Sequence, residues 1–503
     1  MTASVLPTTT TFQVGIRQRS LRRHCRLGRA TELVFILATG AMLVLGGQAE
    51  AQDRTWDAGG ATTNWLTLNN WAGGGAGRVP DTVGETALIT GGGGALQPVI
   101  GAGDSVTVGG TNISGGSLTV AGTLTSPVTV SGTGVLSISS GGAVVGAVTA
   151  GGAGGSNAGT ITGNLTATAG GLTNQGVVTG TTTLNGPASL FLATGTNLSD
   201  TQQVTVNQGT LDVNASDTIG SLAGTGGQVD IASGQTLTAG GDNTSTQYDG
   251  GIIGDGTFTK AGTGTLTLTG ATSVASTSIS AGTLAVTGAG TIVGNISGGA
   301  AGTLSTDGGA LSSSTNIAGD ITLEITGDET VGNLFGFFGD IEVNNSADLT
   351  LTSGTYDVGG TITGDGGITV DGATVQFNGA DKAYTGETNV VSGGLTLTSG
   401  IASTDVNVSG GSLTATNGAL AAGTALDVSG TGTVNINDDD TVASVTQTGG
   451  TLGGDSTLTV TGTLGQSGGE IASGVTVNVA GAKTLEGGTI AGTLGGAGLT
   501  TVQ

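Results

Sequence analysis

Short stretches in which apolar and small polar residues alternate recur along the chain. Alternation with a period of two, rich in β-branched residues and bounded by Gly, Ser, Asn or Asp, predicts β-strands. Beyond the first 51 residues we find no convincing apolar period of 3.6, so we predict an all-β body. The clearest pairs and triplets are Leu118 and Val120, Val128 and Val130, Val204 and Val206, Leu211 and Val213, Leu266 and Leu268, Leu284 and Val286, Leu323 and Ile325, Leu395 and Leu397, Val406 and Val408, Val434 and Ile436, and Val475, Val477 and Val479.

Proline and side-chain size distinguish between the all-β architectures. No proline follows Pro187, as expected where continuous strand ladders leave few positions that tolerate a missing N–H. Small, uniform side chains and quasi-repeats favour a solenoid over a sandwich or barrel. With about 20 to 25 residues per coil, the body would form roughly 20 turns and extend on the order of 100 Å. Its interior would hold ladders of Val, Leu, Ile and Thr.

Residues 1–51 differ from the body and resemble an export signal. An apolar run over residues 33–47 is too short to cross a bilayer as a helix, and Ala49-Glu50-Ala51 offers small residues for cleavage. We predict a signal peptide cleaved after Ala51. An uncleaved anchor or a twin-arginine signal at Arg22-Arg23 is less favoured. The basic residues that precede the apolar run are Arg17, Arg19, Arg22, Arg23, Arg26 and Arg29.

The charge of the remaining residues excludes several classes of partner. After residue 51 the chain has five basic and 33 acidic residues, a net charge of −28. Such a chain repels nucleic acids and anionic membranes, because both are bound by clusters of Lys and Arg. His24 and Cys25, the only histidine and cysteine, lie within the leader. A cleaved chain therefore has no disulfide, and its stability must come from a large repetitive core.

The three tryptophans, Trp56, Trp65 and Trp71, fall in one segment directly after the predicted cleavage point. We assign residues 52–90 to an N-terminal cap and residues 91–503 to the β-helix repeats. A stack of strands exposes its first edge, and a bulky aromatic segment would protect it. The alternative is a platform on which carbohydrate rings stack, which we consider less favoured than the cap.

Two stretches resemble the autotransporter-associated β-strand repeat of type V secreted passenger domains. The first, residues 254–284, contains GDGTFTKAGTGTLTLTG and then SAGTL; the second, residues 364–397, contains GDGGI, YTGETNV and SGGLTL. The resemblance implies a right-handed parallel β-helix that is exported and then crosses the outer membrane of a Gram-negative bacterium unfolded. The implied partners are an outer-membrane translocator and surface molecules or glycans of host or neighbouring cells.

The chain departs from this family at its C-terminal end. Passengers of this kind are followed by a translocator barrel, whose strands carry aromatic girdles. The last 100 residues contain no Phe, Tyr or Trp. We therefore expect the barrel to be missing, separate or truncated, and the sequence does not support self-translocation.

Candidate catalytic groups are few. Gly103-Asp104-Ser105 and Gly454-Asp455-Ser456 resemble an element of secreted esterases. A serine nucleophile normally needs a histidine base, which the cleaved chain lacks, so we reject a serine hydrolase. A carbohydrate-active enzyme could use carboxylates alone, and Asp438-Asp439-Asp440 is the densest acidic run. A solvated turn explains that run more simply, and Arg54 and Arg78 lie far from it in the sequence.

Acidic turns and one aromatic cluster are the remaining candidate binding features. Calcium could bind acids on turns, but the chain has no Gly-Gly-x-Gly-x-Asp array and no EF-hand loop. The cluster from Leu334 to Asp340 contains three phenylalanines. We favour an interior aromatic ladder there over an exposed partner contact. Lys260, Lys382 and Lys483 are too sparse to form a basic patch.

We therefore predict a non-enzymatic, secreted or cell-surface β-helical passenger that serves as an adhesin or surface spacer. No catalytic, cofactor-binding or metal-binding residue is assigned. The main alternative is a structural matrix or surface-layer protein that self-associates, and the less favoured one is a carbohydrate-active β-helix. The sequence does not identify the receptor, the calcium dependence or the oligomeric state.

Overall fold

A computed structural model describes residues 52–72, 79–91, 96–193 and 197–503. The predicted signal peptide of residues 1–51, with His24 and Cys25, and Arg78 lie outside the described residues. Among the described residues, no helix is long and apolar enough to span a membrane. The described chain is all-β apart from the short helix η1 (Leu68–Asn70).

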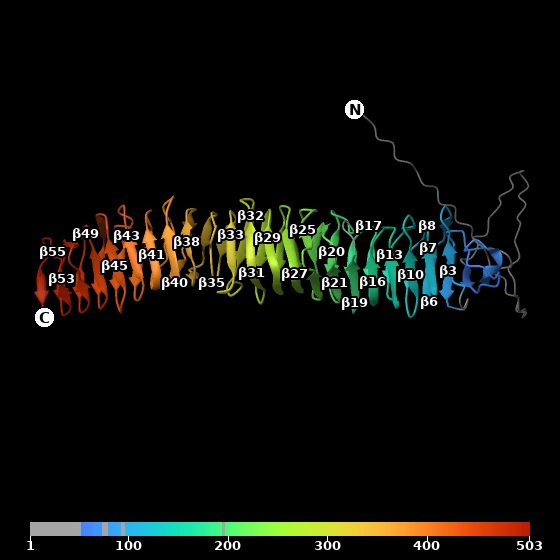
Figure 1. Ribbon diagram of the computed structural model, residues 1–503, viewed down its shortest axis with the longest axis horizontal. Coiled ribbons are helices and arrows are strands. Elements are labelled where there is room, and N and C mark those ends of the chain that lie inside the picture. The colour runs from blue at the N-terminus through green and yellow to red at the C-terminus, as the bar shows by residue number, and fades with distance from the viewer. Residues whose placement is uncertain (1–51, 73–78, 92–95, 194–196) are drawn as a thin grey trace, which may run out of the picture. The chain divides into compact units, whose positions relative to one another are not determined.

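The strands stack in parallel as a solenoid of about 21 turns (Figure 1). Successive turns vary in length: Val148 pairs with Leu165, 17 residues later, whereas Ala87 pairs with Thr111, 24 residues later. The predicted all-β parallel β-helix of roughly 20 turns is confirmed. Variable turn length is possible because extra residues are accommodated at corners, while the strands remain in register.

Within the described residues, six sheets form the faces of this stack. The first contains β2 (Trp71–Ala72), β1 (Gln52–Trp56), β3 (Glu85–Thr90), β6 (Gly110–Gly115), β9 (Val128–Val130), β12 (Val148–Ala150), β15 (Leu165–Ala167), β18 (Thr182–Leu184), β20 (Gln203–Val206) and β23 (Ser221–Ala223). The second contains β4 (Val99–Ile100), β7 (Ser117–Val120), β10 (Val135–Ile138), β13 (Gly154–Asn157), β16 (Gly170–Asn174), β19 (Ala188–Leu192), β21 (Thr210–Val213), β22 (Asp217–Ile219), β24 (Gln228–Ile231), β25 (Thr236–Ala239), β27 (Gly251–Lys260), β29 (Ala271–Ile279), β31 (Thr291–Gly298) and β33 (Asn316–Gly319).

Two smaller sheets form other faces. The third contains β5 (Ser105–Thr107), β8 (Thr123–Thr125), β11 (Ala143–Val145), β14 (Thr160–Thr162) and β17 (Val177–Val178). The fourth contains β26 (Thr246–Tyr248), β28 (Thr265–Leu268), β30 (Gly282–Val286), β32 (Gly302–Thr306), β34 (Thr322–Ile325), β36 (Ile341–Val343) and β39 (Ile362–Thr363).

The last two sheets belong to the C-terminal part of the stack. The fifth contains β35 (Glu329–Val331), β37 (Asp348–Leu351), β38 (Thr355–Val358), β40 (Gly367–Phe377), β41 (Thr388–Leu397), β42 (Asp405–Val408), β43 (Ser412–Ala415), β44 (Ala425–Val428), β45 (Thr433–Ile436), β47 (Ser444–Gln447), β48 (Thr451–Gly454), β50 (Leu464–Gln466), β51 (Glu470–Ile471), β53 (Lys483–Leu485), β54 (Thr489–Ile490) and β56 (Thr500–Val502). The sixth contains β46 (Asp440–Val442), β49 (Thr457–Val460), β52 (Thr476–Val479) and β55 (Thr493–Gly495).

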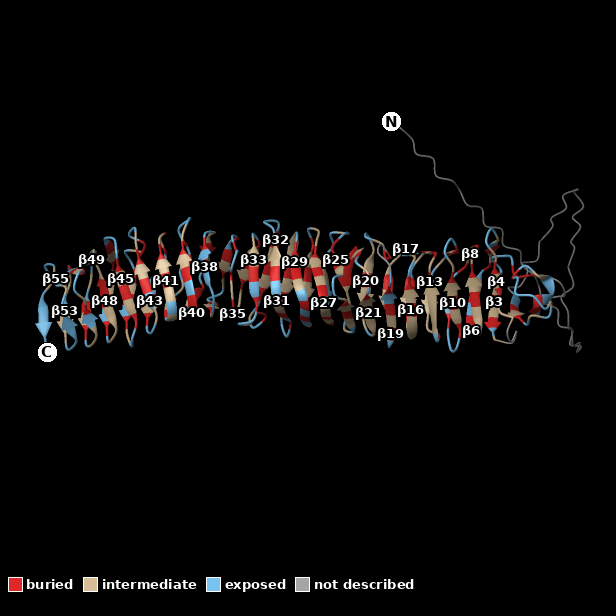
Figure 2. Ribbon diagram, viewed as in Figure 1, coloured by how far each residue is buried: buried red, intermediate tan, exposed pale blue. Residues whose placement is uncertain are grey.

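The core consists of buried apolar residues that recur along the stacked strands, and Figure 2 shows buried positions over most of the length of the ribbon. Along strands such as β7 the residues alternate between buried and half-buried, as the period of two predicts. Register stacks like on like, so that Leu118 lies beside Leu136 and Val120 beside Ile138. Each apolar side chain is therefore covered by its equivalents on the turns before and after it.

Both repeat copies that resemble the passenger family begin with a Gly-Asp-Gly sequence. In the first copy it lies inside β27, where the pairing with β29 shifts register, and in the second it lies in the bend between β39 and β40. Gly254 and Gly364 have φ values of 110° and 107°, a region that side chains with a β-carbon rarely enter. A β-carbon at Gly254 would also collide with the carbonyl oxygen of Ile231, and one at Gly364 with that of Val343. Close stacking of consecutive turns therefore requires glycine at these two positions.

Candidate functional site

The three tryptophans are buried in the N-terminal segment, residues 52–72 and 79–91, which we call the tryptophan end. The ring centroids of Trp65 and Trp71 lie 4.5 Å apart, and those of Trp56 and Trp71 lie 5.2 Å apart, both edge to face. Each indole N–H donates to a backbone carbonyl, those of Leu96, Pro80 and Trp65. Because the rings are buried and their donors are used, they form no exposed platform for carbohydrate.

Strand β2 lies at the edge of the first sheet. It pairs antiparallel with β1, which pairs in parallel with β3. Chain reversal at this point covers the part of the β1 edge at Thr55 and Trp56.

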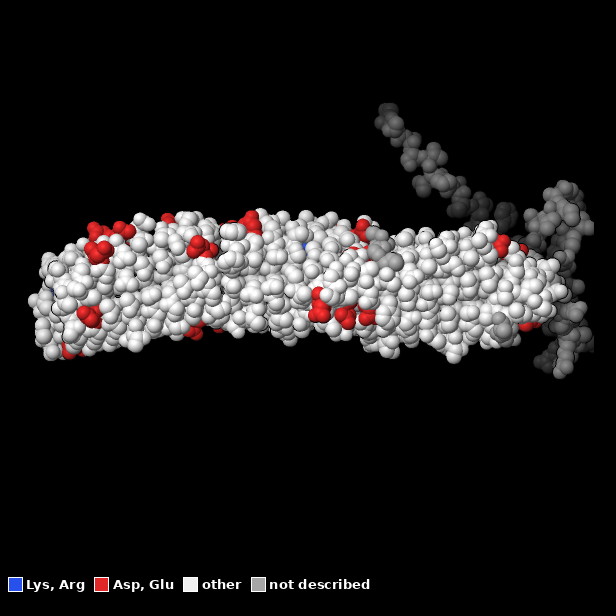
Figure 3. Space-filling view, viewed as in Figure 1, with Lys and Arg blue, Asp and Glu red and all other residues white. Residues whose placement is uncertain are grey.

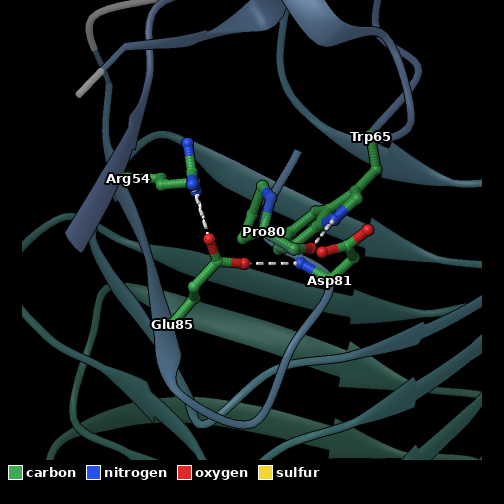
Figure 4. A network of polar contacts seen from close by, with 5 residues as sticks. All are labelled: Arg54, Trp65, Pro80, Asp81 and Glu85. Atoms are coloured by element: carbon green, nitrogen blue, oxygen red, sulfur yellow. Dashed lines mark hydrogen bonds and ion pairs between the residues drawn. The ribbon is translucent and has the colours of Figure 1, made fainter. Parts of the chain in front are cut away.

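A buried ion pair joins β1 to β3 at the tryptophan end (Figure 4). The Arg54 Nε donates to Glu85 Oε1 at 2.8 Å, and Glu85 Oε2 accepts the backbone N–H of Asp81 at 3.0 Å. Burial by itself would raise the pKa of Glu85. The hydrogen bonds from Asp81 and Arg54 outweigh burial and hold the pKa below its ordinary value. Both Glu85 oxygens are thus bonded within the tryptophan end, one to Arg54 and one to Asp81.

All three lysines are internal, which the sequence analysis missed. Lys260, Lys382 and Lys483 are 2%, 0% and 3% exposed. The ammonium group of Lys382 donates to the carbonyls of Gly360, Asn378 and Ala380, each at 2.7 Å. Burial lowers the pKa of Lys382, while Asp381 and Asp340 oppose that shift. The ammonium thus satisfies corner carbonyls from two consecutive turns.

The other two lysines follow the same plan. Lys260 donates to the carbonyls of Ala261, Gly262 and Ala281 at 2.6, 3.0 and 3.2 Å, and burial lowers its pKa. Lys483 donates to the carbonyls of Gly496 and Gly498. The sequence feature that accompanies these buried positions is a single lysine next to Ala in a stretch rich in Gly.

Buried carboxylates perform the complementary task of accepting backbone N–H groups. Asp217 accepts from Leu198 at 2.9 Å and from Thr218 at 3.0 Å. Glu329 accepts from Ala310 and Leu311, one turn earlier. Burial raises the pKa of Asp217 to about 6, against the lowering effect of its backbone donors. Burial likewise raises the pKa of Glu329.

The carboxylates of the acidic run Asp438-Asp439-Asp440 all accept backbone N–H groups. Asp438 accepts the N–H of Asn417, and Asp439 accepts that of Thr457. Asp440 is 4% exposed and accepts from Leu420 and Thr441. Asp438 and Asp440 thus bond to the preceding turn at residues 417–420, whereas Asp439 bonds to the following turn at Thr457.

The two Gly-Asp-Ser sequences lie at separate corners. Gly103 has a φ of 85°, and Asp104 Oδ2 accepts the N–H of Gly101 at 3.1 Å. In the second sequence, the N–H groups of Asp455 and Ser456 both bond to the carbonyl of Ile436. Both sequences therefore form turns between strands.

One surface hollow, with a volume of about 380 Å³, is lined by Asp212, Asp230 and Asp255 together with neutral residues. Asp212 and Asp230 lie in register on β21 and β24. Burial, and then the charge of Asp230, raise the pKa of Asp212. Within the described ranges, no group of three or more acidic, histidine or cysteine side chains is arranged to hold a metal ion.

The phenylalanine cluster is divided between the interior and the surface. Leu334 and Phe337 are 0% and 1% exposed, whereas Phe335 and Phe338 are each 72% exposed. The expected interior position is confirmed for Phe337 and is wrong for Phe335 and Phe338. A tight turn, which period-two reasoning does not describe, directs these two rings outward.

The described surface is acidic and lacks exposed basic side chains. Arg54, the fourth basic residue in the described ranges, is 3% exposed. Figure 3 shows scattered acidic patches on a largely neutral face. The three lysines form no basic patch, as predicted, and the reason is that they lie inside the rod.

Comparison with protein-family models, with curated proteins and with solved structures finds no match to this chain. The fold is therefore shown by the structure alone. The type V passenger assignment remains an interpretation of the two repeat copies.

Proposed function

We propose that this protein is a non-enzymatic, exported β-helical rod that acts at the cell surface as an adhesin or spacer. The observation that carries the proposal is the continuous stack of about 21 turns, in which the acids considered for catalysis bond to backbone N–H groups. A long rod with a net negative charge suits a role that depends on reach and solubility.

The passenger interpretation rests on the leader and on the two repeat copies. An exported chain of this kind would cross the periplasm and use an outer-membrane translocator. A rod stabilised by backbone ladders and buried ions needs no disulfide, which fits passage across the outer membrane as an unfolded chain. The proposed location is the surface of a Gram-negative bacterium or the medium around it.

Location is the first test. The native host would express an epitope-tagged full-length gene, and intact cells would be treated with proteinase K. Trypsin is unsuitable, because the described lysines and Arg54 are buried. Loss of the tag signal from intact cells, with a periplasmic marker protected, supports the proposal. A tag that is degraded only after the outer membrane is opened contradicts it.

A shortened rod separates the spacer role from the adhesin role. Val406 pairs with Leu426, and Leu426 pairs with Val445. Removing residues 406–444 therefore deletes two turns and joins strands that keep their register. For a spacer, we expect cell attachment to fall with length while binding by the purified rod is unchanged. Equal attachment by both lengths contradicts the spacer role.

A further inference from the structure

The turn from Leu334 to Phe338 holds two exposed aromatic rings on a fixed backbone. Phe337 N–H donates to the carbonyl of Leu334 at 3.0 Å, and Gly336, with a φ of 73°, lies within this turn. The Phe335 N–H donates to Asn333 Oδ1 at 2.9 Å. Buried Leu334 and Phe337 anchor the turn from inside the rod. The outward rings are therefore presented by a structured turn.

The neighbouring turn binds this backbone tightly. Phe338 N–H donates to the carbonyl of Gly319, and Gly319 N–H donates to that of Gly336, both at 2.8 Å. A β-carbon added at Gly336 would meet no atom within 4 Å. The tip of the turn thus faces open space.

A row of asparagines leads to the aromatic turn. Asn295 pairs with Asn316, and Asn316 pairs with Asn333, so that one amide lies on each of three successive turns. The Asn316 Nδ2 donates to Asn295 Oδ1 at 3.1 Å, and both residues are exposed. The row offers neutral donors and acceptors beside the two rings.

The charges around the aromatic turn restrict the charge that a ligand can carry. Asp320 and Asp340 are exposed near the turn, and no described Lys or Arg is exposed anywhere on the rod. The hydrogen bonds from Thr361 lower the pKa of Asp340, which keeps it ionised. An anionic ligand would meet only like charge, so the occupant must be uncharged or cationic.

The small size of the aromatic surface argues against a second copy of the chain. Two rings that are each 72% exposed present on the order of 300 Å², whereas a stable protein interface buries about 800 Å² on each partner. A sugar ring needs far less area. Its C–H face carries partial positive charge and suits the negative face of an aromatic ring.

We propose that Phe335 and Phe338, together with the asparagine row of residues 295, 316 and 333, form a contact site for a neutral glycan. The inference rests on the proposed adhesin function and names the class of molecule that the rod contacts. The rings supply stacking surfaces, and the amides supply hydrogen bonds to sugar hydroxyls.

The test uses the full chain and three neutral hexasaccharides, of glucose, mannose and galactose, in titration calorimetry. We expect at least one to bind, and the double variant F335A/F338A to bind it at least tenfold more weakly. The N316A variant should weaken binding by a smaller factor. The matched control is F191A, because Phe191 is also partly exposed, at 37%, but lies on β19; its affinity should not change.

Several results would overturn the inference. They are failure of all three sugars to bind, equal affinity of the double variant, or stronger binding of a sulfated hexasaccharide than of the neutral ones. A change in oligomeric state of F335A/F338A in sedimentation would instead assign the turn to self-association. Circular dichroism of each variant checks that the fold is intact.

Cell assays separate this inference from the proposed function. If the unaltered protein reaches the surface and mediates attachment, and F335A/F338A attaches equally well, the glycan site is wrong and the adhesin role stands. If the unaltered protein does not reach the surface, the proposed function is wrong, whatever the calorimetry shows.

Discussion

The tryptophan end and the repeating body, residues 96–503, deal with buried charge in different ways. At the tryptophan end, Arg54 and Glu85 pair with each other. In the body, Lys382 and Asp217 are each buried among backbone carbonyls or N–H groups. The ion pair needs two side chains of opposite charge on two strands, β1 and β3. The arrangement in the body needs only a corner, and corners recur on every turn.

The two regions should also unfold differently. In a solenoid each turn contacts only its neighbours, so a local defect weakens one part of the stack. All three tryptophans are at the tryptophan end, and their fluorescence reports that region alone. Far-UV circular dichroism reports the whole rod. The two signals together separate the regions in one urea titration.

The largest effect is expected at the ion pair. Replacing Arg54 with Met leaves the Glu85 carboxylate buried without its partner, which typically costs about 3 to 5 kcal/mol. The fluorescence midpoint in urea should fall strongly, while the circular dichroism midpoint of the body changes little.

The double variant R54M/E85L is the matched control for that prediction. It removes both charges, and apolar replacements of a buried pair are often neutral. It should recover most of the lost stability. Equal shifts of both signals in R54M would show that the two regions unfold as one unit and would contradict the comparison.

A smaller loss is expected for Lys382→Met in the body. Three corner carbonyls lose their charged donor. Because the variant no longer buries a charge, part of that loss is offset, and we expect a net loss of about 2 to 3 kcal/mol. Circular dichroism should report the change and tryptophan fluorescence should not. Glu387→Gln, a nearby exposed residue, should have almost no effect. Unchanged stability of K382M would show that the ammonium is not needed at this corner.

Asp217 gives the body a distinct pH dependence. Its pKa is about 6 in the folded rod, against an ordinary value of 3.8. The folded state therefore binds more protons, and this group favours folding increasingly as pH falls from about 6 to about 4. Asp217→Asn should remove this contribution, on the order of 2 kcal/mol, from the stability curve of the rod. Parallel curves for D217N and the unaltered protein over this range would contradict the assignment.

The last test uses the unaltered protein and measures how slowly trypsin cleaves it. Because Lys260, Lys382 and Lys483 are buried, trypsin should cleave after them at least about 100-fold more slowly in the folded protein than in urea. Mass spectrometry of the fragments tests each site. Rapid production of fragments ending at Lys382 from folded protein would show that the turns around it open readily.

Sequence patterns were enough to predict the body as an all-β parallel solenoid of roughly 20 turns. The reason is that a period of two determines which side chains face inward, and stacking repeats this choice on every turn. The sequence shows that both repeat copies contain a glycine at the equivalent positions 254 and 364. Only the structure gives the reason, because a β-carbon there would collide with the preceding turn.

The positions of the charged and aromatic side chains were decided by tertiary structure. Lysine side chains are usually exposed, yet here consecutive corners place carbonyls around each ammonium and thereby make burial possible. The period of two likewise does not predict that Phe337 is buried while Phe335 and Phe338 are exposed. It applies to extended strands, and these residues lie in a turn around Gly336. Local alternation thus determined the strands of this protein. Contacts between residues about 20 positions apart determined where its charges lie and which rings reach the solvent.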